Sequence, residues 1–413
     1  MRVLLTDGSG LTSKQTSYCL GTAGHHVEAM APSGLSLARC TRYVRRVHPV
    51  APYGRDPLAW LDAAMAIWAT GAFDVLLPTQ EQVAVLSLAE SRLLRAKVVT
   101  VVPPFEALLA VQDKVSAFRT LSRLGIPQPE GTVVERAEEL TGYPRLPIFV
   151  KLPVGTASSG VHLVKTRPAL ALLATSLHDQ GVFARGGVLV QAPVVGPLVM
   201  VQSVFDRGAL VAFHACQRTR EGVNGGASHK RSVPLPSTRG DIERMGTELA
   251  WHGALSADVI VGEDGPMVID VNPRLVEPVN AQRSGTDLVG SLLRIAAGVP
   301  EPGRATPTGD RSGVCTHQLL LAVLGAASDG GRRAVAAELL AAARHRGLYR
   351  DSHEELSPVR HDPMAILPVA AAVLATLCKP PLYSWFTEGS VTSYALTPEG
   401  WQAILDVASR TGT

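Results

Sequence analysis

The chain has 413 residues, of which 46% are hydrophobic and 18% are charged, and its formal net charge is +3. This length predicts two to four domains, and the apolar content excludes a disordered chain. The small net charge gives no support for a nucleic-acid partner. The longest apolar run, residues 364–378, is too short for a membrane span and contains Pro368, so it is predicted to form a buried helix.

The five cysteines are scattered and show no CxxC spacing. This pattern argues against a disulfide framework and a zinc site, and it favours a reducing, cytoplasmic location. The amino terminus carries one positive charge and a short apolar run, so it is interpreted as a first strand and not as a signal peptide. Lysine is rare, with seven of the 39 basic residues, which makes each lysine a more informative candidate for function.

Residues 1–105 alternate short apolar strands with helical segments, a pattern typical of βαβ units and a parallel sheet. The turn Asp7-Gly8-Ser9-Gly10 follows the first strand, but the third glycine of the dinucleotide fingerprint is missing. A tight strand-to-helix turn is therefore favoured over an NAD site. An NAD-dependent oxidoreductase built on this domain stays a less favoured alternative.

The next part of the chain contains two lysines and a Gly/Ser loop. Lys114 lies in a predicted helix, Lys151 ends the predicted strand 147–151, and the loop Gly155–Gly160 follows. Such a loop offers backbone N–H groups and hydroxyls with little steric hindrance, as phosphate-binding loops do, although the spacing is not that of a P-loop. The alternatives are a solvent-facing Lys114 and a flexible hairpin tip.

Arg218 and Arg220 lie two residues apart on a predicted strand and are expected to point to one face of it. The small residues of the loop Gly225-Gly226-Ala227-Ser228 can approach a ligand closely. Arginines at this place suit a carboxylate or a phosphate. The alternative is a solvent-facing arginine pair beside an ordinary loop.

The stretch 258–277 reads DVIVGEDGPMVIDVNPRLVE and carries the most chemistry. Its Asp-Gly pair between two β-branched runs predicts a hairpin, which would bring Asp258 and Asp270 close together. Two carboxylates followed by the amide oxygen of Asn272 suit Mg²⁺, and Arg274 suits a developing negative charge. The alternative is that these carboxylates only keep the strand ends hydrated.

At this point the order of motifs over about residues 1–300 resembles the ATP-grasp superfamily. The Arg218–Ser228 stretch resembles its carboxylate–amine ligase branch, which is related to carbamoyl-phosphate synthetase and biotin carboxylase. The resemblance implies an α/β (α+β) ATP-grasp fold with four parts. These are a Rossmann-like pre-ATP-grasp domain at 1–105, linker helices and a small lid subdomain at 106–195, a core subdomain with the Mg/ATP site at 196–300, and a C-terminal accessory helical or mixed subdomain at 301–413.

The resemblance also implies ATP and Mg²⁺, typically two ions, as cofactors. Arg274 and Lys151 would stabilise the transferred phosphoryl group, and Glu277 would be a general base or an amine anchor. The implied ATP-binding residues are Lys114, Lys151, Ser158, Ser159, Gly160, Leu189, Val190 and Gln191. The implied metal ligands are Asp258, Asp270 and Asn272. The implied acceptor side is formed by Arg218, Arg220, Gly225, Gly226, Ser228 and Glu277.

Some positions depart from the family pattern. Aspartate stands at 258 and 270 where glutamate is usual, Gln191 stands where glutamate is common, and Leu198 replaces a frequently acidic residue. These changes bear on the metal geometry and on the ribose contacts. Residues 301–413 show no recognisable chemistry, and an oligomerising or site-covering role is the open interpretation for them.

The implied function is an ATP- and Mg²⁺-dependent ligase that joins a small carboxylate, often an amino acid, to an amine through an acylphosphate. It would release ADP and phosphate, serve specialised-metabolite or dipeptide biosynthesis, and be compatible with a homodimer. One alternative is another acylphosphate-forming enzyme, of the carboxylase or thiol-ligase type. The Met-Lys-Met of a biotin attachment site is absent, which disfavours a self-contained biotin carboxylase. A nucleotide-binding module that has lost turnover is the third alternative.

Overall fold

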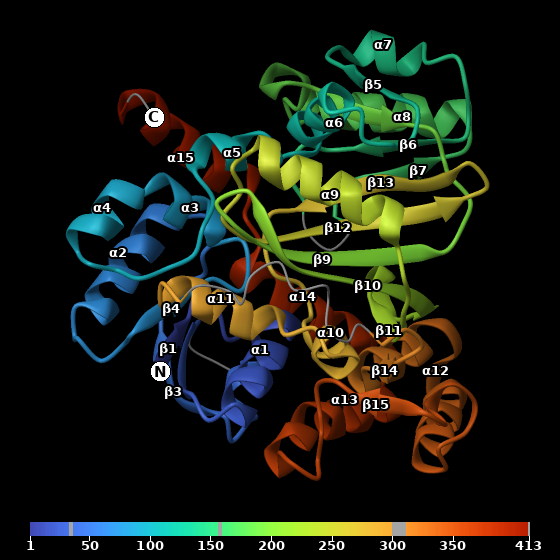
Figure 1. The fold of residues 1–413 in the computed structure, drawn as a ribbon. Helices are drawn as coiled ribbons and strands as arrows, with labels where there is room; N and C mark the ends of the chain where they lie inside the picture. The colour runs from blue at the N-terminus through green and yellow to red at the C-terminus, as the bar shows by residue number, and fades with distance from the viewer. Residues whose placement is uncertain (33–35, 156–158, 300–310, 412–413) are drawn as a thin grey trace.

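The structure is a computed structural model and describes residues 1–32, 36–155, 159–299 and 311–411 (Figure 1). Its N-terminal part is a four-stranded sheet in the order β3-β2-β1-β4, with every neighbouring pair parallel. This confirms the βαβ pattern predicted from the sequence. The elements are β1 (Arg2–Leu5), α1 (Leu11–Thr22), β2 (His26–Ala31), η1 (Leu37–Arg39), β3 (Val44–Pro49), α2 (Pro57–Trp68), β4 (Val75–Leu77), α3 (Val83–Leu88) and α4 (Glu90–Arg95).

The second part is a small antiparallel sheet in the order β5-β8-β6-β7, which we call the lid subdomain. Its own core packs α7 and α8 onto the sheet through buried aliphatic side chains. The lid subdomain therefore forms a unit with its own core, beside the seven-stranded sheet described next (Figure 1). The elements here are α5 (Phe105–Leu109), α6 (Lys114–Arg123), β5 (Gly131–Val134), α7 (Ala137–Thr141), β6 (Ile148–Lys151), β7 (Val161–Val164), α8 (Arg167–Asp179), η2 (Phe183–Arg185) and β8 (Val188–Gln191).

The third part is a seven-stranded sheet in the order β13-β12-β9-β10-β11-β14-β15, which we call the core sheet. Two of its strands, β14 and β15, come from beyond residue 310, so the C-terminal region extends the core sheet as well as adding helices. The elements up to residue 299 are β9 (Leu198–Asp206), β10 (Ala209–Glu221), η3 (Val223–Gly225), β11 (Ala227–Ser232), α9 (Pro236–Glu248), β12 (Gly253–Gly262), β13 (Gly265–Asn272), α10 (Val279–Ser284) and α11 (Leu288–Ala296).

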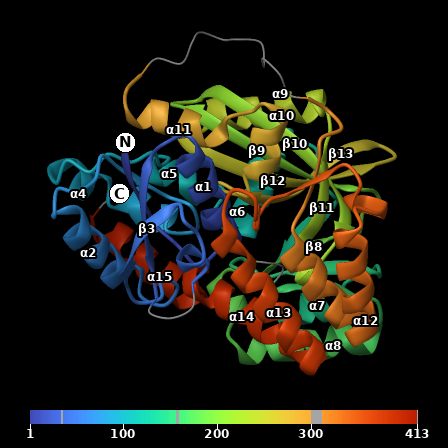
Figure 2. The same cartoon turned by 90° about the horizontal axis from the view of Figure 1, so that it is seen from below.

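The C-terminal helices run from the edge of the core sheet back to the N-terminal sheet, where α15 contacts α2 and α3 (Figure 2). The long helix α12 is interrupted at Gly331, whose φ of 63° is left-handed. The elements are β14 (Cys315–His317), α12 (Leu319–Ala343), η4 (Gly347–Tyr349), β15 (Ser352–Glu354), η5 (Pro363–Ala365), α13 (Ile366–Cys378), η6 (Pro380–Leu382), α14 (Tyr383–Tyr394) and α15 (Pro398–Thr411).

The prediction of a buried helix at 364–378 is wrong in one respect. Helix α13 packs on α12 by a single face, and Leu367 and Leu374 are 52% and 67% exposed. An apolar run does not by itself require burial on all sides, because a protein surface keeps many apolar atoms. Of the helices in the described ranges, none is both long enough and apolar enough to cross a membrane.

Candidate functional site

The predicted hairpin is present, and it places two carboxylates side by side. Strands β12 and β13 pair antiparallel around a turn that ends at Gly265, and Asp258 lies directly opposite Asp270. Burial and, after it, the charge of the neighbouring Asp270 carboxylate raise the pKa of Asp258 to about 7. Two carboxylates that disfavour each other's charge in this way are stabilised by a cation between them.

The donor set fits Mg²⁺ in particular. Asn272 follows Asp270 at the end of β13 and lines the same pocket. Within the described residues, no three His, Cys, Asp or Glu side chains are grouped around a single point, so the protein alone does not form a closed cage for a metal. Magnesium is commonly held by one or two carboxylates with phosphate oxygens and water completing the shell, which this open arrangement allows.

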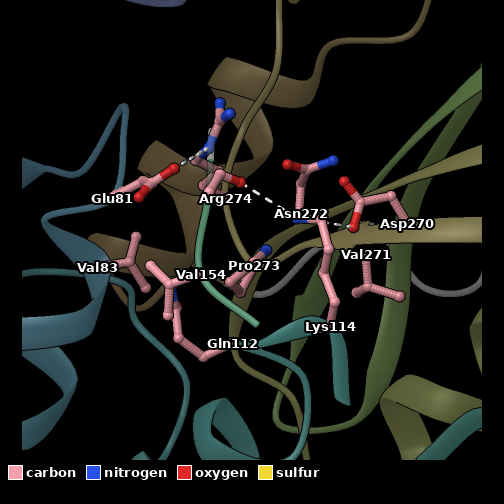
Figure 3. A pocket seen from close by; sticks show the side chains of 11 residues that line it. Glu81, Val83, Gln112, Lys114, Val154, Asp270, Val271, Asn272, Pro273 and Arg274 are labelled. Carbon is pink, nitrogen blue, oxygen red and sulfur yellow. Dashed lines mark hydrogen bonds and ion pairs between the residues drawn. The ribbon is translucent and has the colours of Figure 1, made fainter. Parts of the chain in front are cut away.

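Both candidate lysines reach the end of β13 from the lid subdomain. The amine of Lys151 is buried and donates to the carbonyl of Ile269 at 2.7 Å, and burial lowers its pKa although Asp270 partly opposes this. The amine of Lys114 donates to the carbonyl of Gly155 at 3.1 Å and lies 3.6 Å from Oδ1 of Asp270. Figure 3 shows the Lys114 amine beside the Asp270 carboxylate. The Lys151 amine contacts the residue that precedes Asp270 in β13.

Lys114, Asp270 and Asn272 line one pocket between the N-terminal part, the lid subdomain and the core sheet, and Lys151 and Asp258 lie behind them. Figure 3 shows Arg274 facing Glu81, whose Oε1 lies 3.9 Å from Nε of Arg274. Sequence reasoning missed Glu81. Its position just past the carboxyl end of a parallel strand, where ligands of such sheets commonly bind, was an available indication. The pocket is lined by Glu81, Val83, Gln112, Lys114, Val154, Gly155, Asp270, Val271, Asn272, Pro273 and Arg274.

Gly155, at the start of the Gly/Ser loop, lines this pocket. Ser158 falls outside the described residues, whereas Gly155, Ser159 and Gly160 are described. The N–H of Leu152 donates to the carbonyl of Gly160 at 2.8 Å and closes the base of the loop. A Cβ on Gly155 would lie 2.2 Å from the carbonyl oxygen of Ser159, so this position requires glycine.

The adenine-side candidates Leu189, Val190 and Gln191 lie on β8, which pairs with β5 on one edge and β6 on the other. A base would therefore meet the end of this strand and not an open edge. Gln191 is buried, and its Oε1 has no hydrogen-bond partner in the described structure. A buried acceptor without a donor is a position that a ligand donor can satisfy.

The two arginines of β10 do not share a face, so the expectation from their spacing is wrong. A β-bulge lies between the two arginines. Arg218 is therefore paired with Lys230 of β11, and Arg220 is paired with His229, the residue next to Lys230 in the same strand. Consecutive residues of a strand point to opposite faces, so the bulge turns Arg220 to the face opposite Arg218. The Arg218 guanidinium contacts the Glu221 carboxylate at 3.0 Å, and its charge is one of those that lower the pKa of Asp258.

Arg220 instead joins a buried polar cluster with the C-terminal region. Its guanidinium donates to both carboxylate oxygens of Glu338 at 2.7 and 2.8 Å, and the hydroxyl of Tyr349 donates to the same carboxylate. The Tyr349 ring packs edge-on against His229 and His317. The structure therefore separates Arg220 from the pocket and places it where it fixes the C-terminal helices.

This cluster gives a pH prediction. Burial and, after it, the Arg220 charge lower the pKa of His229 to about 4, whereas an unfolded histidine titrates near 6.5. Stability from the neutral imidazole is complete above about 6.5 and is lost as the pH falls towards 4. We expect the unfolding free energy of the wild type to fall by about 2 kcal/mol more than that of His229→Gln between pH 7 and 5.

Urea unfolding at the two pH values measures this difference. The matched control is His178→Gln, on an exposed face of α8. A pH response in the His229→Gln variant equal to that of the wild type would contradict the assignment.

The remaining acceptor-side candidates are held by the protein itself. The Gly225 carbonyl accepts from Arg218 at 2.6 Å, and Gly226 is next to it at the end of the 3-10 turn η3. The buried Ser228 hydroxyl donates to the carbonyls of Arg220 and Glu221 at 3.2 and 3.3 Å. These residues shape a loop at the edge of the site.

Glu277 lies in a buried ionic network that sequence reasoning missed. Its carboxylate accepts from Lys230 and, at 2.6 Å, from Gln318. The fully buried Lys230 amine also donates to Glu355 at 2.6 Å. Burial lowers the pKa of Lys230, but the two carboxylates outweigh burial and raise it above its usual value. The rarity of lysine in this chain was the one indication of Lys230 that the sequence offered.

Comparison with known proteins agrees with this geometry. Residues 111–278 match the family model described as the ATP-grasp domain. Biotin carboxylase of Haemophilus influenzae is 25% identical over 223 residues, which is 48% of this chain and 48% of that protein. The chain therefore aligns with about half the length of this curated relative.

Solved structures share the fold. The biotin carboxylase domain dimer of Hydrogenobacter thermophilus 2-oxoglutarate carboxylase, in complex with MgADP, ADP and bicarbonate, has a TM-score of 0.59 at 18% identity, covering 76% of this chain and 73% of that chain. Phosphoribosylamine–glycine ligase from Thermotoga maritima has a TM-score of 0.54 at 15% identity, covering 76% and 78%. These relatives include a carboxylase and a ligase, so they leave the branch open. The predicted fold is confirmed: the chain has the ATP-grasp fold with an N-terminal Rossmann-like sheet, and residues 111–278 match the model of the ATP-grasp domain.

Proposed function

We propose that the protein is an ATP- and Mg²⁺-dependent ligase that joins a small carboxylate, such as an amino acid, to an amine through an acylphosphate. The observation that carries the proposal is the convergence of Lys114, Lys151, Arg274 and the Asp258–Asp270 pair at one end of the β12–β13 hairpin. This set of charges suits a triphosphate whose terminal group is transferred.

Asp258, Asp270 and Asn272 would hold Mg²⁺, which when bound supplies neutralising charge to the phosphates. Lys151 would bind a phosphate oxygen with an amine that is already buried, so little water has to be displaced. Lys114 would exchange its contact with Asp270 for a phosphate oxygen. Arg274 would stabilise the terminal phosphoryl group as it moves.

The reaction needs activation because a carboxylate is a poor electrophile. The substrate carboxylate oxygen attacks the terminal phosphorus, ADP leaves, and an acylphosphate forms. The amine then attacks the acyl carbon, phosphate leaves, and the amine proton passes to a base. Glu277 is the proposed amine anchor or base, and the loop at 155–160 would exclude water from the acylphosphate.

A second candidate is an acylphosphate-forming carboxylase, and the match to biotin carboxylase favours it. The two candidates differ in the co-substrate. A carboxylase would release ADP with bicarbonate present and without an added amine. A ligase would require a pair of carboxylate and amine.

The test is an assay of ADP and AMP release by the purified protein with Mg²⁺-ATP and a panel of amino acids, small carboxylates and bicarbonate. ADP release that depends on a carboxylate–amine pair supports the ligase. AMP release would show adenylation and sink the acylphosphate reaction. Tight ATP binding without hydrolysis in any mixture would favour the nucleotide-binding module. Light scattering of the same sample tests the proposed homodimer.

Lys151→Ala provides a direct prediction for the site. We expect turnover to fall by at least about 100-fold, because a buried cation that contacts the phosphates is lost. The control is Lys165→Ala, which removes an exposed lysine after β7 of the same subdomain and should leave turnover unchanged. Thermal unfolding of both variants shows whether the fold is kept. Wild-type turnover in Lys151→Ala would remove this residue from the proposed site.

A further inference from the structure

Glu81 lies at a junction of three parts of the chain. It follows β4 of the N-terminal sheet, and its Oε1 lies 3.9 Å from Nε of Arg274, which follows the core sheet. Its Oε2 accepts a hydrogen bond of 2.9 Å from the backbone N–H of Leu396 in the C-terminal region. The Glu81 and Arg274 side chains are each only 13% exposed, so water screens the attraction between their charges less than it would at the surface.

The C-terminal contact is made by residues 393–397, the last two residues of α14 and the three that lead into α15, which we call the C-terminal strap. The carbonyl of Ser393 accepts from the N–H of Tyr53 at 3.2 Å. The N–H and hydroxyl of Thr397 donate to the carbonyl of Gly54 at 3.1 and 3.0 Å. The strap is thus fixed to the N-terminal part at both of its ends.

Tyr394 places the strap against the turn that follows β1 of the N-terminal sheet. Its ring lies so close to Gly10 that a Cβ there would be 3.2 Å from the ring. Burial raises the pKa of Tyr394, and the charges acting on it include those of Arg274, Glu81 and Glu277. Within the strap, Leu396 contacts Glu81, which does line the pocket.

The backbone of Arg274 is held independently of its side chain. Its N–H donates to the carbonyl of Asn272 at 2.7 Å, and its carbonyl accepts from the hydroxyl of Ser256 at 2.9 Å. In the described part of the chain, Glu81 is the one acidic side chain recorded within 4 Å of the guanidinium. The recorded ionic contact of the guanidinium thus comes from outside its own strand.

We propose that Glu81 is a positioning residue for Arg274, and that the C-terminal strap holds Glu81 in the orientation this requires. Glu81 itself does not touch the reacting atoms. The effect on catalysis rests on the proposed function of Arg274, whereas the effect on the orientation of Arg274 does not. The C-terminal region, which shows no chemistry in its sequence, would act on the site through one backbone N–H group.

Glu81→Gln is the principal test, because glutamine can still accept from Leu396 while the charge facing Arg274 is lost. We expect kcat to fall on the order of 10- to 100-fold, with the KM for ATP changed by less than about 3-fold, since misplacing a catalytic group affects the transition state most. The matched control is Glu106→Gln in the exposed first turn of α5. In an Arg274→Lys background, Glu81→Gln should lower kcat by less than about 2-fold.

A magnetic-resonance measurement separates this inference from the proposed function. The Nε–H resonance of Arg274, assigned by its loss in Arg274→Lys, should shift in Glu81→Gln and not in Glu106→Gln. If it shifts while no substrate pair gives turnover, the ligase proposal falls and the positioning contact stands. An unchanged resonance, or a kcat within about 2-fold of wild type in an active protein, would overturn the inference.

The strap is tested by Gly54→Ala, because a Cβ there would lie 2.0 Å from the carbonyl oxygen of Ala395 and must displace the strap. The control is Gly240→Ala in α9, where a Cβ meets no atom within 4 Å. We expect Gly54→Ala to lower kcat and to shift the Arg274 resonance, with little further loss when combined with Glu81→Gln. Additive losses in the double variant would show that the strap does not act through Glu81.

Discussion

Asp270→Asn is expected to reduce ATP turnover by at least about 100-fold while leaving the fold intact. The substitution preserves the shape of the side chain and removes one of the two facing carboxylates of the β12–β13 hairpin. Asparagine is a weaker ligand for Mg²⁺, and the charge that balances Lys114 is lost as well. Both changes act on the phosphates and not on a hydrophobic core.

The matched control is Asp264→Asn, an exposed aspartate in the turn of the same hairpin, which should keep wild-type turnover. Turnover is measured as ADP release over a series of Mg²⁺ concentrations, and EDTA should stop it in the wild type. The Asp270→Asn variant should need more Mg²⁺ for any residual activity. Wild-type turnover at an unchanged Mg²⁺ requirement would contradict the metal site.

The hairpin could be predicted because its determinants are local in sequence. The Asp264-Gly265 pair fixes the turn and the register from there to the pair Val259–Val268. An irregularity between Asp258 and Val259 then shifts the register by one residue and places Asp258 opposite Asp270. The parallel N-terminal sheet was predictable for a similar reason, since alternating strands and helices leave few other arrangements. Motifs within about 20 residues therefore gave the metal side of the site.

The rest of the site depends on contacts between distant segments. The bulge in β10 that separates Arg218 from Arg220 arises from pairing with β11, and spacing along one strand does not reveal it. The partners of Lys230 are Glu277 and Glu355, the second of them 125 residues away. Glu81 meets the N–H of Leu396 across 315 residues. The C-terminal region contains no recognisable motif, so its contacts with Lys230 and Glu81 could not be predicted from the sequence.

The buried ionic network leads to the second large effect, which concerns stability. Lys230 is fully buried and contacts the carboxylates of Glu277 and Glu355, while Gln15 and Gln318 donate to Glu355 at 2.9 and 2.8 Å. These side chains come from the N-terminal helix α1, from the core sheet and from the C-terminal region. The network therefore ties all three parts together around a single positive charge.

Lys230→Met is expected to lower the free energy of unfolding by about 3–5 kcal/mol, because it leaves two buried carboxylates without their cation. Lys165→Met, at an exposed lysine, should change it by less than about 0.5 kcal/mol. The pKa of Lys230 is raised in the folded protein, so its contribution is fully present below the ordinary lysine pKa of about 10.5. Urea unfolding should thus show a constant difference between wild type and Lys230→Met from pH 6 to 9, shrinking only above about pH 10.5. A difference below about 1 kcal/mol at pH 7 would mean that the network does not hold the three parts together.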